Sequence, residues 1–197
     1  MLTTLLEPGL RLTICGLDEL GNHCTSDVTH VLSILDPDYG EPSAFAAYDP
    51  HHRLTLRFHD IIGPWPGWSP PERPHIEALV EFGRELDEAG ENLRHLLVHC
   101  HAGVSRSTAA MATLLARHTP LGEEESIFAR IRAIRPIAWP NSRMIGFADQ
   151  VLGRGGRLSA ALRQHYRLQA PQRPDFVEEL RRSGRGAEIP EDDVNRA

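Results

Sequence analysis

Residues 95–111, HLLVHCHAGVSRSTAAM, join an apolar run to an alanine-rich run, and they decide how the chain is expected to fold. The run HLLVHC has the length and apolar content of a buried strand, whereas STAAMATLLA is apolar or small on nearly all sides, as in a buried helix. The loop between them, from Cys100 to Arg106, has a glycine at its centre. We expect this loop at the carboxyl edge of a sheet, where open α/β sheets bind their ligands.

Apolar and amphipathic patterns on both sides of this stretch predict the rest of the fold. Further strands are expected at residues 10–17, 28–35 and 53–60. Helices are expected at residues 75–90, 107–116, 123–134, 140–152 and 158–168. Strands that alternate with helices predict an α/β fold, with a central, mainly parallel sheet flanked by helices in a single domain.

The composition changes near residue 170. The predicted domain covers residues 1–169, and residues 170–197 are rich in charge, proline and glycine, so we expect a mobile or peripheral tail. The segment GRGGR at residues 153–157 superficially suggests a phosphate loop. It follows a predicted helix instead of a strand, so we expect a helix–helix turn.

Length, charge and cysteine content limit the possible classes of protein. The chain has 197 residues, enough for one domain with a sizeable core, and a formal net charge of −6. This charge does not favour nucleic acid or an anionic membrane as a partner, and no apolar run could span a bilayer. The first residues, MLTTLLEPGLRLTI, lack an early basic segment, so we expect no signal peptide. Three scattered cysteines do not make a disulfide framework, and we expect a cytoplasmic location. None of these features indicates an oligomeric state.

All 21 basic residues are arginine, and the chain contains no lysine. Codon usage in a GC-rich genome is the simplest explanation. The chemical consequence is that Schiff-base catalysis and the lysine-bearing nucleotide P-loop are both excluded. Any anion that this protein binds must be held by arginine, histidine or backbone amides.

The loop from Cys100 to Arg106 is suited to binding a tetrahedral anion. A short loop with a central glycine can turn its N–H groups inward at the start of a helix, and the helix dipole there also favours a thiolate. Arg106 offers a planar fork that can hold two oxygens at once. A lone cysteine would suggest an inert buried thiol, but the thiol, the amides and the guanidinium together describe a nucleophile that attacks phosphorus.

The residues H-C-x-x-G-x-x-R-S-T, from His99 to Thr108, resemble the signature of the cysteine-dependent protein tyrosine phosphatases, HCxxGxxR(S/T). The layout of residues 10–165 looks like the compact dual-specificity-like branch and predicted bacterial tyrosine phosphatases. The segment IRAIRPIAWPN also resembles the R-x-x-R…P-N stretch that follows the active-site helix in that branch. The resemblance does not cover the tail.

This resemblance implies a role for each signature residue. Cys100 would be the nucleophile that forms a phosphocysteine, and Arg106 would bind the phosphate and its transition state. Ser107 would help the thiolate leave in the second step, and His99 would orient the loop. No cofactor or metal is implied. The substrate phosphate would be cradled by the backbone amides of His101, Ala102, Gly103, Val104, Ser105 and Arg106.

A phosphatase of this kind also needs a carboxylic acid to protonate the leaving oxygen. Asp60 ends a predicted strand 40 residues before Cys100, as the general acid does in compact members of the family. If the two strands are parallel, both residues lie at one edge of the sheet. Glu72, inside the following Pro/Gly/Trp-rich segment, is an alternative acid, and so are Asp36 and Asp38 after the second strand. Trp65 and Trp68 of that segment either touch substrate or cover the core.

The same resemblance implies a protein phosphotyrosine substrate. The chain has no equivalent of the tyrosine-bearing loop of the large classical phosphatases, which implies a shallow pocket that also accepts phosphoserine and phosphothreonine. The alternatives are a phosphoinositide or inositol phosphate, or a pseudophosphatase that binds phosphoproteins without turnover. A further hypothesis is a metal site at Cys100 with His95, His99 and His101, but these residues lie too close together on a strand and a tight loop to surround one ion.

Overall fold

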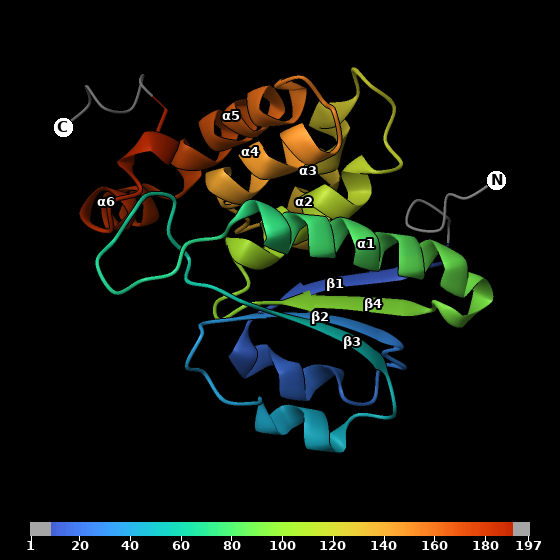
Figure 1. The fold of residues 1–197 in the computed structure, drawn as a ribbon. Coiled ribbons are helices and arrows are strands. Elements are labelled where there is room, and N and C mark those ends of the chain that lie inside the picture. The colour runs from blue at the N-terminus through green and yellow to red at the C-terminus, as the bar shows by residue number, and fades with distance from the viewer. Residues whose placement is uncertain (1–8, 191–197) are drawn as a thin grey trace.

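A computed structural model describes residues 9–190, in which four parallel strands form a sheet of order β1-β4-β2-β3 (Figure 1). All four strands lie where the sequence predicts them, so the parallel α/β fold is confirmed. Each pairing is parallel, and the carboxyl ends of β2, β3 and β4 therefore meet at one edge. The strands are β1 (Arg11–Cys15), β2 (His30–Leu35), β3 (His52–Arg57) and β4 (His95–His99).

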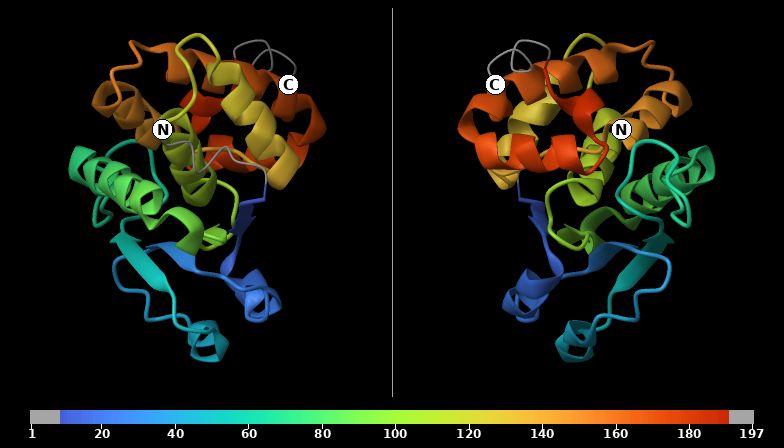
Figure 2. Two further views of the ribbon diagram at one scale, coloured as in Figure 1. Left: turned by 90° about the vertical axis from the view of Figure 1, so that its right-hand side faces the viewer. Right: turned by 90° about the vertical axis from the view of Figure 1, so that its left-hand side faces the viewer.

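Helices α1 to α5 gather on one side of the sheet (Figures 1 and 2). Within residues 9–190, the opposite side carries only the short 3-10 helices η2 (Leu17–His23) and η3 (Ser43–Ala47), which pack over a small separate apolar cluster. The main helices are α1 (Arg73–Ala89), α2 (Arg106–Ala116), α3 (Glu124–Ile134), α4 (Ser142–Val151) and α5 (Arg157–Gln169).

Strand β4 and helix α2 form the centre of the domain. Every residue of both is buried, because β4 lies between β1 and β2, and α2 packs against the sheet, α1, α3 and α4. A small-residue sequence such as STAAMA lets a helix approach its neighbours closely on all sides. The loop that joins β4 to α2 is therefore held between two rigid elements.

The glycine-rich segment at residues 153–157 is the predicted turn between two helices. It joins α4 to α5, and Gly153, Gly155 and Gly156 adopt positive φ angles there.

The predicted mobile or peripheral tail is wrong for residues 170–190. These residues form η5 (Ala170–Gln172), α6 (Pro174–Arg182) and η6 (Gly186–Glu188). Val177, Leu180 and Ile189 are buried in the main core, which explains why the segment stays on the domain despite its charge. The segment that begins the chain, residues 1–8, and the end of the predicted tail, residues 191–197, lie outside the described residues. Within residues 9–190, no helix combines the length and apolar character that crossing a membrane requires.

Candidate active site

The loop from Cys100 to Arg106 lies at the carboxyl edge of the sheet and forms the floor of a pocket of about 660 Å³. Cys100 is buried, with 2% of its surface exposed, and Arg106 is buried as well. Asp60, which follows β3, lines the same pocket. The predicted meeting of Asp60 and Cys100 at one edge is therefore what the structure shows.

The loop turns its carbonyl groups away from its centre. All five carbonyl oxygens of residues 101–105 accept hydrogen bonds from groups outside the loop. Because each peptide bond is trans, the N–H of the following residue points the opposite way, toward the loop centre. The hydrogen bonds to the outward-facing carbonyls thus hold the loop in the shape that the predicted ring of amides requires. The donors are Leu17 N–H (2.9 Å), the Arg135 guanidinium (3.1 and 3.0 Å), Trp139 N–H (2.8 Å) and Ala109 N–H (3.0 Å).

Arg135 is the central support on this outer side. Its guanidinium donates to the carbonyls of Ala102 and Gly103 and also pairs with both carboxylate oxygens of Glu19, at 2.7 and 2.8 Å. Arg135 is the second arginine of the R-x-x-R stretch that resembles the family. It therefore fixes the shape of the loop from its outer side.

Gly103 is required by the loop geometry. Its φ angle is +67°, and a Cβ atom there would lie 2.4 Å from the carbonyl carbon of Cys15. Only glycine combines this backbone conformation with so close an approach.

Arg106 is held by two acceptors at the pocket wall. Its Nη1 atom donates to Asp36 Oδ1 at 2.5 Å and to the carbonyl oxygen of Phe58 at 2.6 Å. Its buried Nε atom has no hydrogen-bond partner within residues 9–190. A buried N–H donor without a partner is costly, so this side of the guanidinium is suited to an anionic ligand.

Ser107 and His99 flank the cysteine. The Ser107 hydroxyl lies 3.2 Å from the Cys100 Sγ atom, within reach of a hydrogen bond to sulfur. The ring of His99 bonds the Ser33 hydroxyl at 2.7 Å across the β4–β2 pair. Burial lowers the pKa of His99 to about 4, so its ring is neutral and supports the end of β4 by hydrogen bonding instead of charge.

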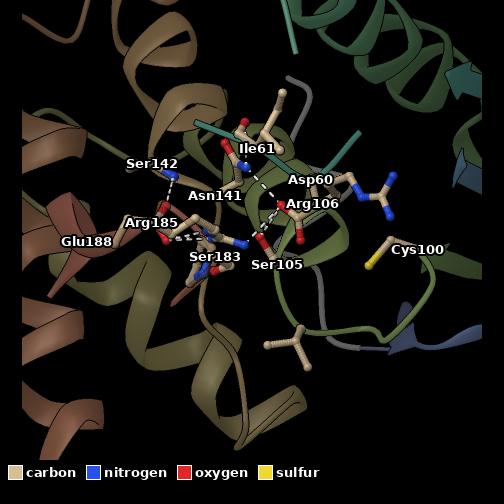
Figure 3. Close-up of polar contacts among 12 residues, drawn as sticks. Asp60, Ile61, Cys100, Ser105, Arg106, Asn141, Ser142, Ser183, Arg185 and Glu188 are labelled. Carbon is tan, nitrogen blue, oxygen red and sulfur yellow. Dashed lines mark hydrogen bonds and ion pairs between the residues drawn. The ribbon is translucent and has the colours of Figure 1, made fainter. Parts of the chain in front are cut away.

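Asp60 is held by several donors at once. Its Oδ1 atom accepts from the Ser105 hydroxyl at 2.7 Å and the Asn141 amide at 2.9 Å, and lies 3.1 Å from Arg185 Nη1 (Figure 3). Burial by itself would raise the pKa of Asp60, but the charges of Arg185 and Arg106 and these hydrogen bonds hold it below its ordinary value. Asp60 is therefore a carboxylate in the unliganded protein.

The alternative acids lie elsewhere. Asp36 is the ion-pair partner of Arg106, a role that the sequence did not indicate. Asp38 and Glu72 are exposed and are not among the residues that line the pocket. Trp65 and Trp68 do line it, and about half of each side chain is exposed, so neither is a core residue.

Arg185 is the site residue that sequence reasoning missed. It is 6% exposed and comes from the segment that was predicted to be a tail. A signal for this segment was present: Pro174 at a helix start, followed by Phe176, Val177 and Leu180 at helical spacing.

The residues of the metal hypothesis have other partners. The His95 ring contacts the Thr13 hydroxyl at 2.8 Å and the Ser26 carbonyl at 2.9 Å, while His99 contacts Ser33. Within the described part of the chain, no group of three or more histidine, cysteine or acidic side chains is placed to hold a metal ion.

Comparisons with known proteins agree with the geometry. The chain is 38% identical to mouse dual specificity protein phosphatase 15 over 147 residues, which cover 75% of this chain and 53% of that protein. It is 30% identical to human protein phosphatase Slingshot homolog 3 over 158 residues, which cover 80% of this chain and 21% of that protein. The crystal structure of human DUSP28 matches with a TM-score of 0.54 at 15% identity, over 78% of this chain and 96% of that chain. No family model matches the chain.

The parallel sheet and the loop that follows its central strand define the fold of the dual-specificity-like phosphatases. With the signature from His99 to Thr108 and these relatives, the chain belongs to the superfamily of cysteine-dependent protein tyrosine phosphatases, in its dual-specificity-like branch. It spans about half, or less, of the length of the curated relatives it matches.

Proposed function

We propose that this protein is a phosphatase that hydrolyses phosphate monoesters through a phosphocysteine at Cys100. One observation carries the proposal: the five outward-bonded carbonyls of residues 101–105, which leave a ring of amides beside a buried thiol. Such a ring matches a tetrahedral dianion, and the unpartnered Arg106 Nε adds a charged donor to it.

In the first step, the Cys100 thiolate attacks phosphorus and the bond from phosphorus to the leaving oxygen breaks. Arg106 and the loop amides bind the phosphoryl oxygens as charge spreads over them. Asp60 takes up a proton from water when the phosphate dianion binds, because the dianion raises its pKa, and gives that proton to the leaving oxygen, which departs as a neutral hydroxyl. The support for this role is the position of Asp60 on the pocket wall with Oδ1 held by three groups, so that Oδ2 carries the proton.

In the second step, water attacks the phosphocysteine and Asp60 takes a proton from it. The sulfur then leaves as a thiolate. The Ser107 hydroxyl, 3.2 Å from Sγ, donates a hydrogen bond that stabilises this charge. His99 keeps the end of β4 in position through Ser33.

The proposed substrate is protein phosphotyrosine. The pocket walls above Cys100 include Trp65, Trp68, Phe176 and Leu180, and these side chains can pack on the phenyl ring of tyrosine. The C-terminal segment supplies two of these side chains, Phe176 and Leu180. Phosphoserine and phosphothreonine, which make fewer contacts with such walls, are proposed as slower substrates.

A second candidate is a phosphate monoester that is not a protein. Arg173 and Arg182 line the same pocket, which favours a phosphoinositide or inositol phosphate with additional phosphates, although Glu179 beside them reduces the positive charge. A pseudophosphatase is disfavoured because Cys100, Arg106 and Ser107 form a complete set.

A substrate panel on purified protein tests the proposal. Phosphotyrosine, phosphoserine and phosphothreonine peptides, phosphoinositides and inositol phosphates are assayed with wild type and Cys100→Ser, with and without a chelator. We expect turnover of the phosphotyrosine peptide that resists the chelator, needs a reducing agent, is blocked by vanadate and is lost in Cys100→Ser. Turnover that needs an added divalent metal, or that persists in Cys100→Ser, would contradict the proposal. Preferred turnover of an inositol phosphate would select the second candidate.

The setting of the enzyme is also proposed. We place it in the cytoplasm, where Cys15, Cys24 and Cys100, all free thiols here, stay reduced. Its partner is a phosphorylated protein. The curated relatives named above are from mouse and human, so a bacterial origin is proposed only on the resemblance to predicted bacterial tyrosine phosphatases.

A further inference from the structure

Residues 174–189 lie after the predicted end of the phosphatase domain at residue 169. In the structure, this segment contacts the active-site pocket. Phe176, Leu180 and Ser183 line the pocket together with Cys100. Trp65 of the loop after β3 lies against the same segment, since a Cβ on Gly184 would be 3.1 Å from its ring. The segment is thus a wall of the site that holds the substrate.

Within this segment, the buried side chains of Glu188 and Arg185 form a chain of ion pairs that ends at Asp60. Glu188 Oε1 accepts from the Ser142 N–H at the start of α4, at 2.7 Å. Its Oε2 accepts from Arg185 Nε and lies 2.5 Å from Nη2, while Nη1 lies 3.1 Å from Asp60 Oδ1 (Figure 3). Glu188 is 1% exposed. This arrangement fixes the Arg185 guanidinium from behind and directs its other nitrogen at Asp60.

Burying three charges has a cost that a merely structural role does not explain. Replacing buried ion pairs with apolar side chains of similar volume is often neutral or stabilising. Three groups contact the Oδ1 atom of Asp60: the Ser105 hydroxyl, the Asn141 amide and the Arg185 guanidinium. Of these three, the guanidinium carries a full positive charge. It therefore controls both where the carboxylate lies and how readily it takes up a proton.

We propose that Arg185 is a positioning residue for the acid–base step, through which the C-terminal segment sets the orientation and proton affinity of Asp60. This inference rests on the proposed function of Asp60. Arg185 pulls Oδ1 toward Ser105 and Asn141, so that Oδ2 is presented to the leaving oxygen. The positive charge of the Arg185 guanidinium stabilises the carboxylate form of Asp60. This is the form that acts as the base in the second step.

Other groups also face Asp60, and they stay in place when Arg185 is changed. Arg106 favours the carboxylate, and Glu188 opposes it. Removing only Arg185 should therefore raise the pKa of Asp60. Among the described residues, the charged, titratable and polar groups that interact with Asp60 include His101, Ser105 and Arg106 of the loop, Asn141 before α4, Tyr166 of α5, and Arg185 and Glu188.

The test compares Arg185→Gln with Arg185→Lys and with Arg181→Gln, which removes a charge from α6, in the same C-terminal segment, where Arg181 pairs with Glu178. The alkaline limb of kcat/KM on a phosphotyrosine peptide should move to higher pH in Arg185→Gln, by on the order of one pH unit. Arg185→Lys should restore much of the difference, and Arg181→Gln should match wild type. A limb that does not move in an active Arg185→Gln enzyme would overturn the inference.

A second variant and a second measurement test the inference if Arg185→Gln does not fold or has no activity. If Arg185→Gln does not fold, the double variant Arg185→Gln/Glu188→Gln removes both charges and is expected to show a smaller shift in the same direction, because losing Glu188 removes a charge that opposes the Asp60 carboxylate. Carbon-13 NMR titration of the Asp60 carboxyl, assigned with Asp60→Asn, follows its pKa in a Cys100→Ser background without any turnover. An unchanged Asp60 titration would overturn the inference. A wild-type enzyme without Cys100-dependent turnover, with a shifted Asp60 titration, would instead overturn the proposed function and leave the ion pair without a catalytic role.

Discussion

Asp36 Oδ1 lies 2.5 Å from Nη1 of Arg106, joining the turn after β2 to the residue that begins α2. This ion pair and the Phe58 carbonyl hold one side of the guanidinium. The buried Nε atom on the other side has no hydrogen-bond partner among the described residues, so it can donate to a bound phosphate. A residue 70 positions away from Arg106 thus orients the phosphate-binding group.

Asp36→Asn should therefore weaken phosphate binding without affecting the acid step. Losing one charge-assisted hydrogen bond should lower kcat/KM about tenfold. The loss should be equal for phosphotyrosine and for nitrophenyl phosphate, because it is independent of the leaving group. Steady-state kinetics on both substrates checks this, with the exposed Asp38→Asn as the matched control. A larger loss on phosphotyrosine would mean that Asp36 acts as the acid.

Asp60→Asn should lower turnover of phosphotyrosine roughly 10²- to 10⁴-fold, since the tyrosine hydroxyl is a poor leaving group without protonation. Nitrophenolate leaves with less help, so the loss on nitrophenyl phosphate should be visibly smaller. Glu72→Gln, on the exposed residue before α1, is the control and should behave as wild type. Equal losses on both substrates for Asp60→Asn would assign this residue to binding or loop structure.

The pH profile should reflect the ion pairs around Asp60. As the acid, Asp60 must be protonated, and the cations and hydrogen bonds around it keep its pKa low in the free enzyme. The alkaline limb of kcat/KM should therefore lie at lower pH than an ordinary carboxyl pKa would place it, with an optimum on the acid side of neutrality. A bound phosphate dianion raises the pKa of Asp60, so the alkaline limb of kcat should lie at higher pH than that of kcat/KM. Coincident limbs, or an unchanged limb in Asp60→Asn, would contradict this assignment.

Gly103→Ala should abolish activity, because the new Cβ would lie 2.4 Å from the backbone of Cys15 at a φ angle of +67°. The loop must then change its shape, and the amide ring is lost. Gly146→Ala on α4 is the matched control, since no atom lies within 4 Å of its Cβ position. It should retain activity and gain about 0.5–1 kcal/mol of stability. Thermal unfolding and phosphatase assays measure both effects, and an active Gly103→Ala enzyme would show that the loop tolerates another shape.

The strands, the helices and the central residues of the site could be predicted because their signals are local. An apolar run followed by Cys100, a glycine loop and Arg106 is contiguous in sequence, and parallel strands bring Asp60 to the same edge. The ion pairs that support the site join distant positions. Arg135 and Glu19 are 116 residues apart, and nothing in either neighbourhood indicates the other.

The role of the C-terminal segment was missed for a different reason. Its average composition is polar, and the polar average concealed four buried apolar residues, Ala170, Val177, Leu180 and Ile189. These are enough to dock the segment because the domain offers them an apolar surface. Composition predicts disorder only when no such surface is available, and a sequence alone does not show that surface.

A covalent intermediate on Cys100 is the most direct test of the proposed chemistry. Rapid acid quench of the enzyme during turnover of a phosphotyrosine peptide, followed by mass spectrometry of its digest, should find one phosphoryl group on the peptide that contains Cys100. The same peptide should carry no phosphoryl group in Cys100→Ser. Ser107→Ala, which removes the hydrogen bond to the leaving sulfur, should increase the amount of phosphoenzyme. Steady turnover with no phosphoryl group on Cys100 in either wild type or Ser107→Ala would contradict the mechanism.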